Sequence, residues 1–196
     1  MDERALLDDW LATLGELTHA EVASLSRDEL AWRPDPLANS VGLTVWHYAR
    51  WLDVLAIRVL DDRPAEEEIW QAAGWAARTG YDPRGIGYLG LGVITGYTAE
   101  EAAAVPILPA EDLLAYFDAA LLALRERLRA LLTAAIHAPV PGLGGGRTVY
   151  ARLKAIMIGC FGHVGEIASL NALRARAVEA GTNGPADRGA KQPSVP

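Results

Sequence analysis

Apolar residues recur at steps of three and four along four long stretches of the chain, which is the spacing of one face of an α-helix. No stretch shows the alternation of apolar and polar residues that a half-buried strand requires. The pattern therefore predicts an all-α protein, a bundle of long helices of which the third is the longest. The predicted helices cover residues 3–24, 40–61, 110–138 and 148–177.

Shorter pieces connect these helices. Ser26 and Glu29 have the spacing of a helix-capping pair, but two prolines follow and stop any long helix, so a short turn and connector is predicted there. Residues 66–80 predict one extra short helix. Residues 80–97 are too rich in glycine for a stable helix and too apolar for a disordered linker. We therefore expect this segment to be an ordered loop that lies against the bundle.

Length and composition describe one domain. The chain has 196 residues, of which 51% are hydrophobic. Residues 181–196 consist mainly of glycine, proline, small polar and charged residues. We predict a bundle domain over residues 1–180 and a disordered tail over residues 181–196.

The charge balance and the single cysteine limit the classes of function. The chain has 18 Lys and Arg residues and 25 Asp and Glu residues, which give a net charge of −7. It has no excess of basic residues to neutralise phosphate groups, so we expect no nucleic-acid partner. Cys160 cannot form an intramolecular disulfide, and the first residues carry no secretion signal, so we expect a cytoplasmic protein. No run of about 18 uncharged apolar residues occurs, and we expect no membrane span.

Two of the four histidines, His47 and His163, lie in strongly apolar helical segments and are the main candidates for chemistry. A neutral imidazole suits zinc, nickel, copper or iron, and a ligating histidine usually donates its second N–H to a carboxylate or carbonyl. The alternative is a pair of core histidines whose ring nitrogens are hydrogen-bonded, which is the more common role of a histidine on an apolar face. We expect His19 and His137 to lie at the surface or at helix ends.

Arg50 and Asp53 follow His47 in the second long helix. Arg50 lies about 60° around the helix from His47, and Asp53 lies near Arg50 but farther from the histidine. We therefore interpret Arg50 and Asp53 as an ion pair that holds the helix surface, and not as additional metal ligands.

The last helix places two further polar groups beside His163. Cys160 lies one turn before His163 and Glu166 one turn after it. We expect Cys160 to be a small buried residue, because a reactive thiol needs an electropositive and partly exposed site. Glu166 is then the candidate partner of the His163 ring.

The segments around the two histidines resemble the metal-site helices of the DinB-like superfamily, which includes DinB proteins, bacterial thiol S-transferases and the mycothiol-dependent maleylpyruvate isomerase domain. They read SVGLTVWHYARWLD over residues 40–53 and HVGEIASL over residues 163–170, and the resemblance spans about residues 5–175. It implies an all-α, up-down-down-up four-helix bundle that is frequently a homodimer. Many members hold a divalent metal with one histidine from the second bundle helix and a His-x3-His or Glu-x3-His pair from the fourth.

Carried over to this chain, the resemblance implies that His47 and His163 ligate a divalent metal, zinc or nickel. The remaining ligand position, four residues before His163, is Gly159, which has no side chain to coordinate with. A catalytic zinc site normally holds three protein ligands, so the departure affects the metal itself. Glu166, Cys160 or a group from elsewhere in the chain are the alternatives for the third ligand.

Three glycines, at positions 159, 162 and 165, form a stripe of small residues beside the last histidine. One explanation is the close approach of another helix. The other is that the missing side chains leave a cavity over the two histidines, lined by Trp46, Tyr48 or Trp51 and roofed by the glycine-rich loop. Such a cavity suits a mostly apolar small-molecule ligand, and Trp46 and Trp51 are the candidate ligand-binding residues.

Two functions from different classes follow. The first is a metal-dependent thiol S-transferase or isomerase, which presents a low-molecular-weight thiol to a small electrophile. Its catalytic candidates are Glu166, to orient His163 or act as a base, and Arg50, to position the site on the second helix. The second is a metal-free small-molecule-binding or interaction protein that has lost catalysis, which Gly159 favours. A purely structural helical dimer is a third alternative.

Overall fold

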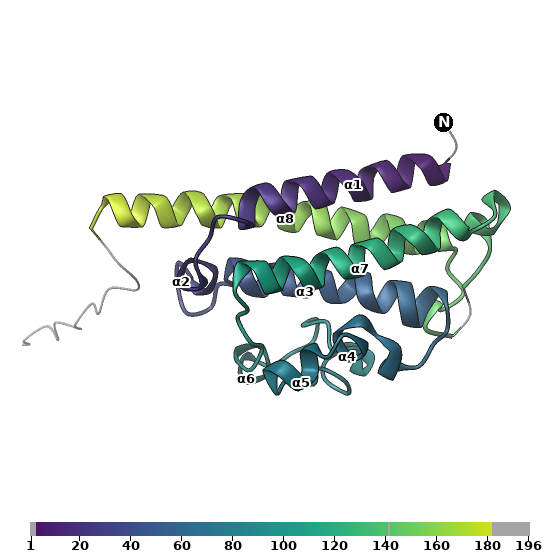
Figure 1. Ribbon diagram of the computed structural model, residues 1–196, viewed down its shortest axis with the longest axis horizontal. Helices are drawn as coiled ribbons and strands as arrows, with labels where there is room; N and C mark the ends of the chain where they lie inside the picture. The colour runs from purple at the N-terminus through teal and green to yellow at the C-terminus, as the bar shows by residue number, and fades with distance from the viewer. Residues whose placement is uncertain (1–2, 141, 182–196) are drawn as a thin grey trace, which may run out of the picture.

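The computed structural model describes residues 3–140 and 142–181, and its regular elements are helices (Figure 1). Four long helices form the bundle that the sequence predicts, and no β-strand occurs among the described residues. In Figure 1, α1 and α8 run in one direction and α3 and α7 run in the other, which confirms the up-down-down-up order. The four helices are α1 (Glu3–Val22), α3 (Val41–Val54), α7 (Ala110–Ala130) and α8 (Val149–Glu179).

Helix α3 is the centre of the core. It packs against α7 and α8, and α1 closes the bundle by packing against the same two helices. Most side chains of α3 are buried, because the segment between α3 and α7 covers the side of α3 that faces away from α1 (Figure 1). As a consequence, charged residues of α3 lie inside the protein as well as apolar ones.

The ends of α3 follow the sequence prediction. The Ser40 side chain caps the first turn and accepts a hydrogen bond of 3.2 Å from the Leu43 amide. At its other end α3 continues into a π-helical segment, η1 (Leu55–Leu60), whose wider turn still buries most of its apolar side chains. The chain then turns at Asp62, which has a positive φ of 53°.

The connectors contain more helix than predicted. The segment from Ser26 forms a short helix, α2 (Arg27–Ala31), with a complete capping box between Ser26 and Glu29. The single helix predicted over residues 66–80 is wrong, because Gly74 adopts a left-handed conformation with φ of 77° and separates two helices. The elements between α3 and α7 are η2 (Ala65–Glu67), α4 (Ile69–Ala72), α5 (Trp75–Thr79), η3 (Tyr88–Gly90) and α6 (Ala99–Ala103).

The longest helix is the last one and not the third. Helix α8 has 31 residues, whereas α7 has 21 and ends where Leu131 adopts an extended conformation. The chain then forms two short 3-10 turns, η4 (Thr133–His137) and η5 (Gly142–Gly144), before Thr148 caps α8. The predicted tail, residues 182–196 in particular, lies outside the described residues.

Helix α8 is also the one described helix that is long and apolar enough to cross a membrane. A search for uncharged apolar runs passes over it, because Lys154 and Glu166 interrupt the sequence. Core helices of soluble proteins meet the same criterion, and α8 contributes Leu153, Met157 and Ile167 to the core. The expectation of no membrane span therefore stays a prediction.

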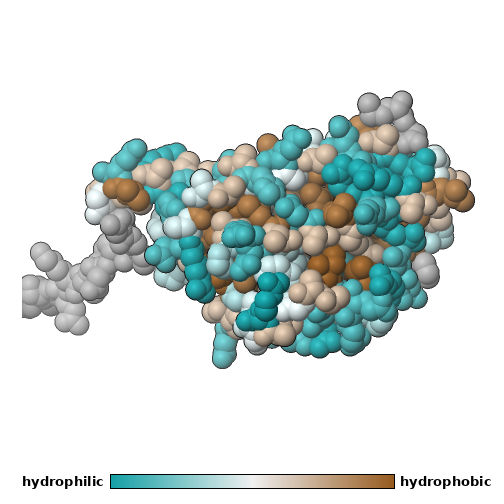
Figure 2. Space-filling model, in the orientation of Figure 1, coloured by the Kyte–Doolittle hydropathy of each residue, from teal (hydrophilic) through white to brown (hydrophobic). Residues whose placement is uncertain are grey.

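The surface is mixed. On the face shown in Figure 2, hydrophobic residues form patches that hydrophilic residues separate. On α1 and α8, Trp10 is 45% exposed and Ile158 is 66% exposed. Both residues border a shallow groove of about 220 Å³ between the two helices.

Candidate functional site

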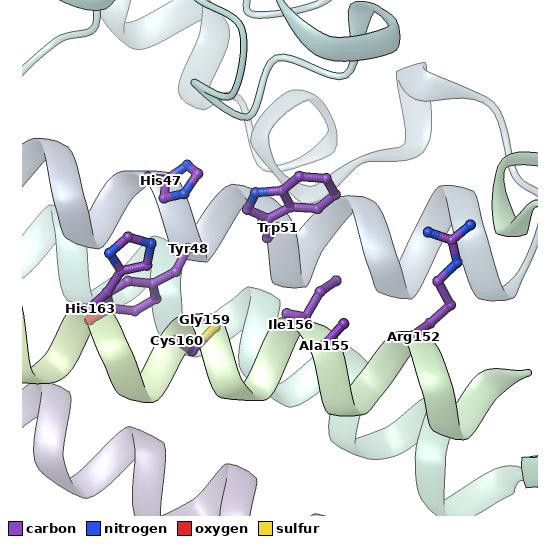
Figure 3. A pocket seen from close by; sticks show the side chains of 9 residues that line it. All are labelled: His47, Tyr48, Trp51, Arg152, Ala155, Ile156, Gly159, Cys160 and His163. Carbon is purple, nitrogen blue, oxygen red and sulfur yellow. The ribbon is translucent and has the colours of Figure 1, made fainter. Parts of the chain in front are cut away.

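The bundle brings His47 of α3 and His163 of α8 together. Their ring centroids lie 4.9 Å apart, and the rings meet edge to face at 86° (Figure 3). The two residues are far apart in the sequence, but α3 and α8 are neighbours in the bundle and each histidine lies on the face turned toward the other helix. By contrast, the other two histidines lie at the surface beside carboxylates: Nε2 of His19 is 2.9 Å from Asp118 and Nε2 of His137 is 2.7 Å from Glu3, as expected of surface residues.

Each histidine uses its Nδ1 atom for a hydrogen bond to an oxygen. The Nδ1 of His47 bonds the backbone carbonyl of Val93, and the Nδ1 of His163 lies 2.8 Å from a carboxylate oxygen of Glu166. A carbonyl oxygen cannot donate a hydrogen, so the Nδ1 of His47 carries the proton. The same tautomer suits His163 beside a carboxylate. The neutral rings then both keep a lone pair on Nε2, which is the arrangement of metal-ligating histidines and their orienting partners.

The electrostatics favour a neutral His47. Burial, followed by the neighbouring His163 ring, lowers the pKa of His47 to about 4. The hydrogen bond with His163 lowers the pKa of Glu166, which is therefore ionised near neutral pH. A neutral imidazole can coordinate a metal or accept a hydrogen bond through Nε2 without first losing a proton.

The carbonyl that holds His47 belongs to the glycine-rich loop, and Arg50 fixes that loop. The Arg50 guanidinium is fully buried and donates hydrogen bonds of 3.2 Å to the carbonyls of Gly92 and Leu91. These are the residues immediately before Val93. The prediction of an ordered loop against the bundle is thus explained by one arginine that binds the loop backbone.

The charge of Arg50 is balanced inside the protein. Its guanidinium pairs with Asp53 at 2.9 Å and with Glu68 at 2.8 Å, and both carboxylates are buried. Asp53 also accepts a hydrogen bond of 3.0 Å from the Tyr116 hydroxyl. Burial raises the pKa of Tyr116 well above its ordinary value, so the hydroxyl stays protonated and can donate. The predicted Arg50–Asp53 ion pair is present, but it lies in the core and not on the helix surface.

A cavity of about 260 Å³ opens beside the two histidines. Three residues of α3 and six of α8 line it, and all nine are labelled in Figure 3. Of the predicted ligand-binding residues, Trp51 lines the cavity, and Tyr48 does as well. Trp46 does not, because it turns toward the short helices, where its ring lies 5.6 Å from that of Trp70.

The other predicted site residues take different places. Arg50 is not among the residues that line the cavity, so it acts on the site through the loop. Glu166 lies beside His163 and orients its ring. Cys160 is buried as expected, although it lines part of the cavity, and burial raises the pKa of its thiol to about 12. A protonated, buried thiol is a poor nucleophile and a poor metal ligand.

Two residues of the site, His47 and His163, are placed to ligate a metal ion, and the site offers no third protein ligand among the described residues. Gly159 lines the cavity one turn before His163 and brings no side chain to it. Glu166 is already hydrogen-bonded to His163, and in the described part of the chain no group of three or more His, Cys, Asp and Glu residues could hold a metal ion. Any metal bound here has at least one position for an exogenous ligand.

Within the residues that the structure describes, the glycine stripe, residues 159, 162 and 165, neither contacts a neighbouring helix nor lies as a whole over the histidines. Gly159, Gly162 and Gly165 are all exposed, and a Cβ atom built on any of them meets no described atom within 4 Å. No neighbouring helix approaches the stripe closely among the described residues. Only Gly159 borders the cavity, which α3 and α8 line without the glycine-rich loop as a roof.

Some residues of the site were not apparent in the sequence. Val93 acts through its backbone carbonyl, which no residue type indicates. Glu68 and Tyr116 contact Arg50 from other parts of the chain, so their spacing in the sequence does not indicate that they are its partners. Arg152 lies two turns before Gly159 on the same helical face, and that spacing is a signal that could have identified it.

Comparisons with known proteins bear on the fold and the family. The chain resembles a conserved protein of Enterococcus faecalis in its crystal structure, with a TM-score of 0.72 and 21% sequence identity over 88% of this chain and 97% of that one. At this identity the likeness shows the fold alone. No curated protein matches the chain. The profile of the DinB superfamily matches residues 10–167. The chain therefore belongs to the DinB superfamily.

Proposed function

We propose that the protein binds a small molecule in the cavity between α3 and α8 and holds a divalent metal ion, zinc or nickel, on His47 and His163. The observation that carries the proposal is the pairing of both Nδ1 atoms with oxygens, while the two rings lie 4.9 Å apart at the edge of the cavity. Oxygen atoms that accept the second N–H of a ligating histidine hold its ring in a fixed tautomer and orientation.

The activity that best suits this site is a thiol S-transferase or isomerase acting on a small electrophile. A bound divalent ion keeps the sulfur of a low-molecular-weight thiol as a thiolate near neutral pH. The chain supplies the rest. Glu166 orients His163, Arg50 fixes the loop whose carbonyl orients His47, and Trp51 and Ile156 keep the cavity apolar. The position that Gly159 leaves without a ligand is where the thiol is expected to approach.

A second candidate is a metal-free binding protein that has kept the bundle and lost catalysis. Gly159 favours it, because a site with two protein ligands binds a metal more weakly than one with three. The two rings are then oriented hydrogen-bonding groups at the edge of the cavity, and Nε2 of each accepts a hydrogen bond from the ligand or from water.

Metal content separates the two candidates. The untagged protein is purified, incubated with zinc or nickel, passed over a desalting column and submitted to elemental analysis. The first candidate predicts stoichiometric metal that is lost in His47→Ala. The matched control is His19→Ala, because His19 is exposed and lies outside the cavity lining. If wild type retains no more metal than His47→Ala, the metal-dependent enzyme is excluded and the binding protein remains.

A further inference from the structure

A single charged residue lies at the end of the cavity opposite the histidines. Arg152 stands near the start of α8, and Figure 3 shows its side chain rising from α8 on the same side as the His163 ring. Eleven residues separate the two positions, which places their Cα atoms roughly 16 Å apart along the helix. The cavity therefore has two chemically different ends on one helix.

The stretch between these ends is apolar. Trp51 of α3 and Ala155 and Ile156 of α8 line the middle of the cavity, and Figure 3 shows the Trp51 ring between the two ends. None of these three offers an ionised group to a ligand. A bound molecule thus meets mostly carbon atoms along the middle of the cavity and a charged lining side chain only at the Arg152 end.

The two ends present different groups to a ligand. The histidine end offers the Nε2 atoms of two rings whose Nδ1 atoms are already bonded to the Val93 carbonyl and to Glu166. Arg152 is the one formally charged residue among those that line the cavity, and it stands out in a chain with a net charge of −7. A guanidinium presents several donors in a plane that matches a carboxylate.

We propose that Arg152 selects the ligand: the cavity takes an elongated molecule with an apolar middle and an anionic group, a carboxylate, that binds Arg152 while its other end reaches the histidine pair. This inference rests on the proposed function for the identity of that second end, a thiol. Arg152 also donates a hydrogen bond of 3.3 Å to the Leu143 carbonyl, which holds its guanidinium in place beside the cavity.

The test compares probes that differ only in charge. Mercapto-octanoate and mercapto-octanol, each with the thiol at the far end of the chain, are titrated calorimetrically against the metal-loaded protein at low ionic strength. The wild type is expected to bind the carboxylate about tenfold more tightly or better, because a charge-assisted hydrogen bond is worth at least that factor.

Substitutions assign the preference to Arg152. Arg152→Gln is expected to abolish the preference for mercapto-octanoate over mercapto-octanol, while Arg152→Lys retains part of that preference as a point charge. The matched control is Arg147→Gln, which makes the same change of net charge at an exposed position outside the cavity lining. Thermal unfolding of each variant shows whether loss of the Leu143 hydrogen bond has changed the fold.

Octanoate and octanol, which lack the thiol, distinguish this inference from the proposed function. If thiols and metal fail to bind but octanoate still exceeds octanol in an Arg152-dependent way, the histidine centre is refuted and the role of Arg152 stands. If thiols bind the metal-loaded protein with no preference for the carboxylate, the role of Arg152 is refuted. Absence of binding by any probe, or an equal loss in Arg147→Gln, also overturns it.

Discussion

The imidazole rings of His47 and His163 meet edge to face with their centroids 4.9 Å apart, although α3 and α8 are far apart in the sequence. Each ring is held from behind by an oxygen, the Val93 carbonyl for one and the Glu166 carboxylate for the other. The site is therefore preorganised before any ligand arrives. What it lacks is a third protein ligand, because the position one turn before His163 is Gly159.

Gly159→His is expected to complete a three-ligand site. A Cβ at this position meets no described atom within 4 Å, so the new side chain has room, and one helical turn carries it to the face of His163. We expect zinc affinity to rise by about tenfold or more, since each added ligand in a fixed geometry strengthens binding. Competition with a chromogenic chelator measures the change.

Gly162→His is the control for that experiment. It makes the same substitution in the same helix with the same open space, but Gly162 does not line the cavity. An equal gain of zinc affinity in both variants means that the new histidine acts as a surface ligand and contradicts the site.

Gly162→Ala is expected to stabilise the protein by about 1 kcal/mol, because alanine has the higher helix propensity and nothing crowds the new methyl group. The unfolding free energy from urea titration measures it. Gly42→Ala gives the opposite result, since a Cβ there lies 3.1 Å from the Leu30 carbonyl and 3.2 Å from Ile107. Destabilisation by Gly162→Ala contradicts the open environment of the stripe and points to a partner that covers it.

Arg50→Met is expected to destabilise the protein by about 3–5 kcal/mol, because it leaves the carboxylates of Asp53 and Glu68 buried without their common partner. It also removes two hydrogen bonds to the glycine-rich loop. The NMR signals of the His47 ring report on the loop independently of stability. If those signals stay unchanged in the folded variant, Arg50 does not position His47.

The stability of the metal-free protein is expected to fall as the pH drops from about 6.5 to about 4. Burial keeps His47 unprotonated in the folded state through this range, whereas the unfolded chain takes up the proton, so protons favour unfolding. The total loss from this group is roughly 3 kcal/mol. Urea titrations at several pH values, with His47→Gln as the reference, measure it. A His47 ring that titrates near 6.5 by NMR contradicts the buried, neutral state.

We propose that the protein forms a homodimer, as its resemblance to the superfamily implies, and that the face with Trp10 and Ile158 contributes to the contact. Both residues are large, apolar and exposed on adjacent helices, and a twofold axis would bring the same face of each copy together. Light scattering gives the mass. Ile158→Glu is expected to shift the protein toward monomer, while Leu122→Glu, on the exposed side of α7, is not. A monomeric wild type refutes the proposal.

The sequence predicted the four long helices, but it did not fully predict the connectors between them or which tryptophan lines the cavity. Periodicity located α1, α3, α7 and α8 because each buries a regular apolar face. It could not show that Gly74 divides a short helix, since the cause is a backbone angle. Trp46 was assigned to the cavity, yet it directly precedes His47, and one residue turns a helix by about 100° toward another face. The convergence of the histidines came from the family resemblance.

The hydrogen bonds from Arg50 to the backbone of the glycine-rich loop affect which amino-acid substitutions the loop can accept. Arginine and histidine both bind main-chain oxygens, of Leu91, Gly92 and Val93, and such contacts are indifferent to which side chains those residues carry. Other contacts do restrict the loop: at Gly92 a φ of 64° and the nearby Pro83 backbone leave no room for a Cβ, at Gly87 the Tyr97 ring has the same effect, and the side chains of Leu91 and Val93 are buried. Substitutions at exposed loop residues such as Tyr88 and Leu89 can therefore alter the outer surface of the protein while the imidazole beneath it keeps the same orientation.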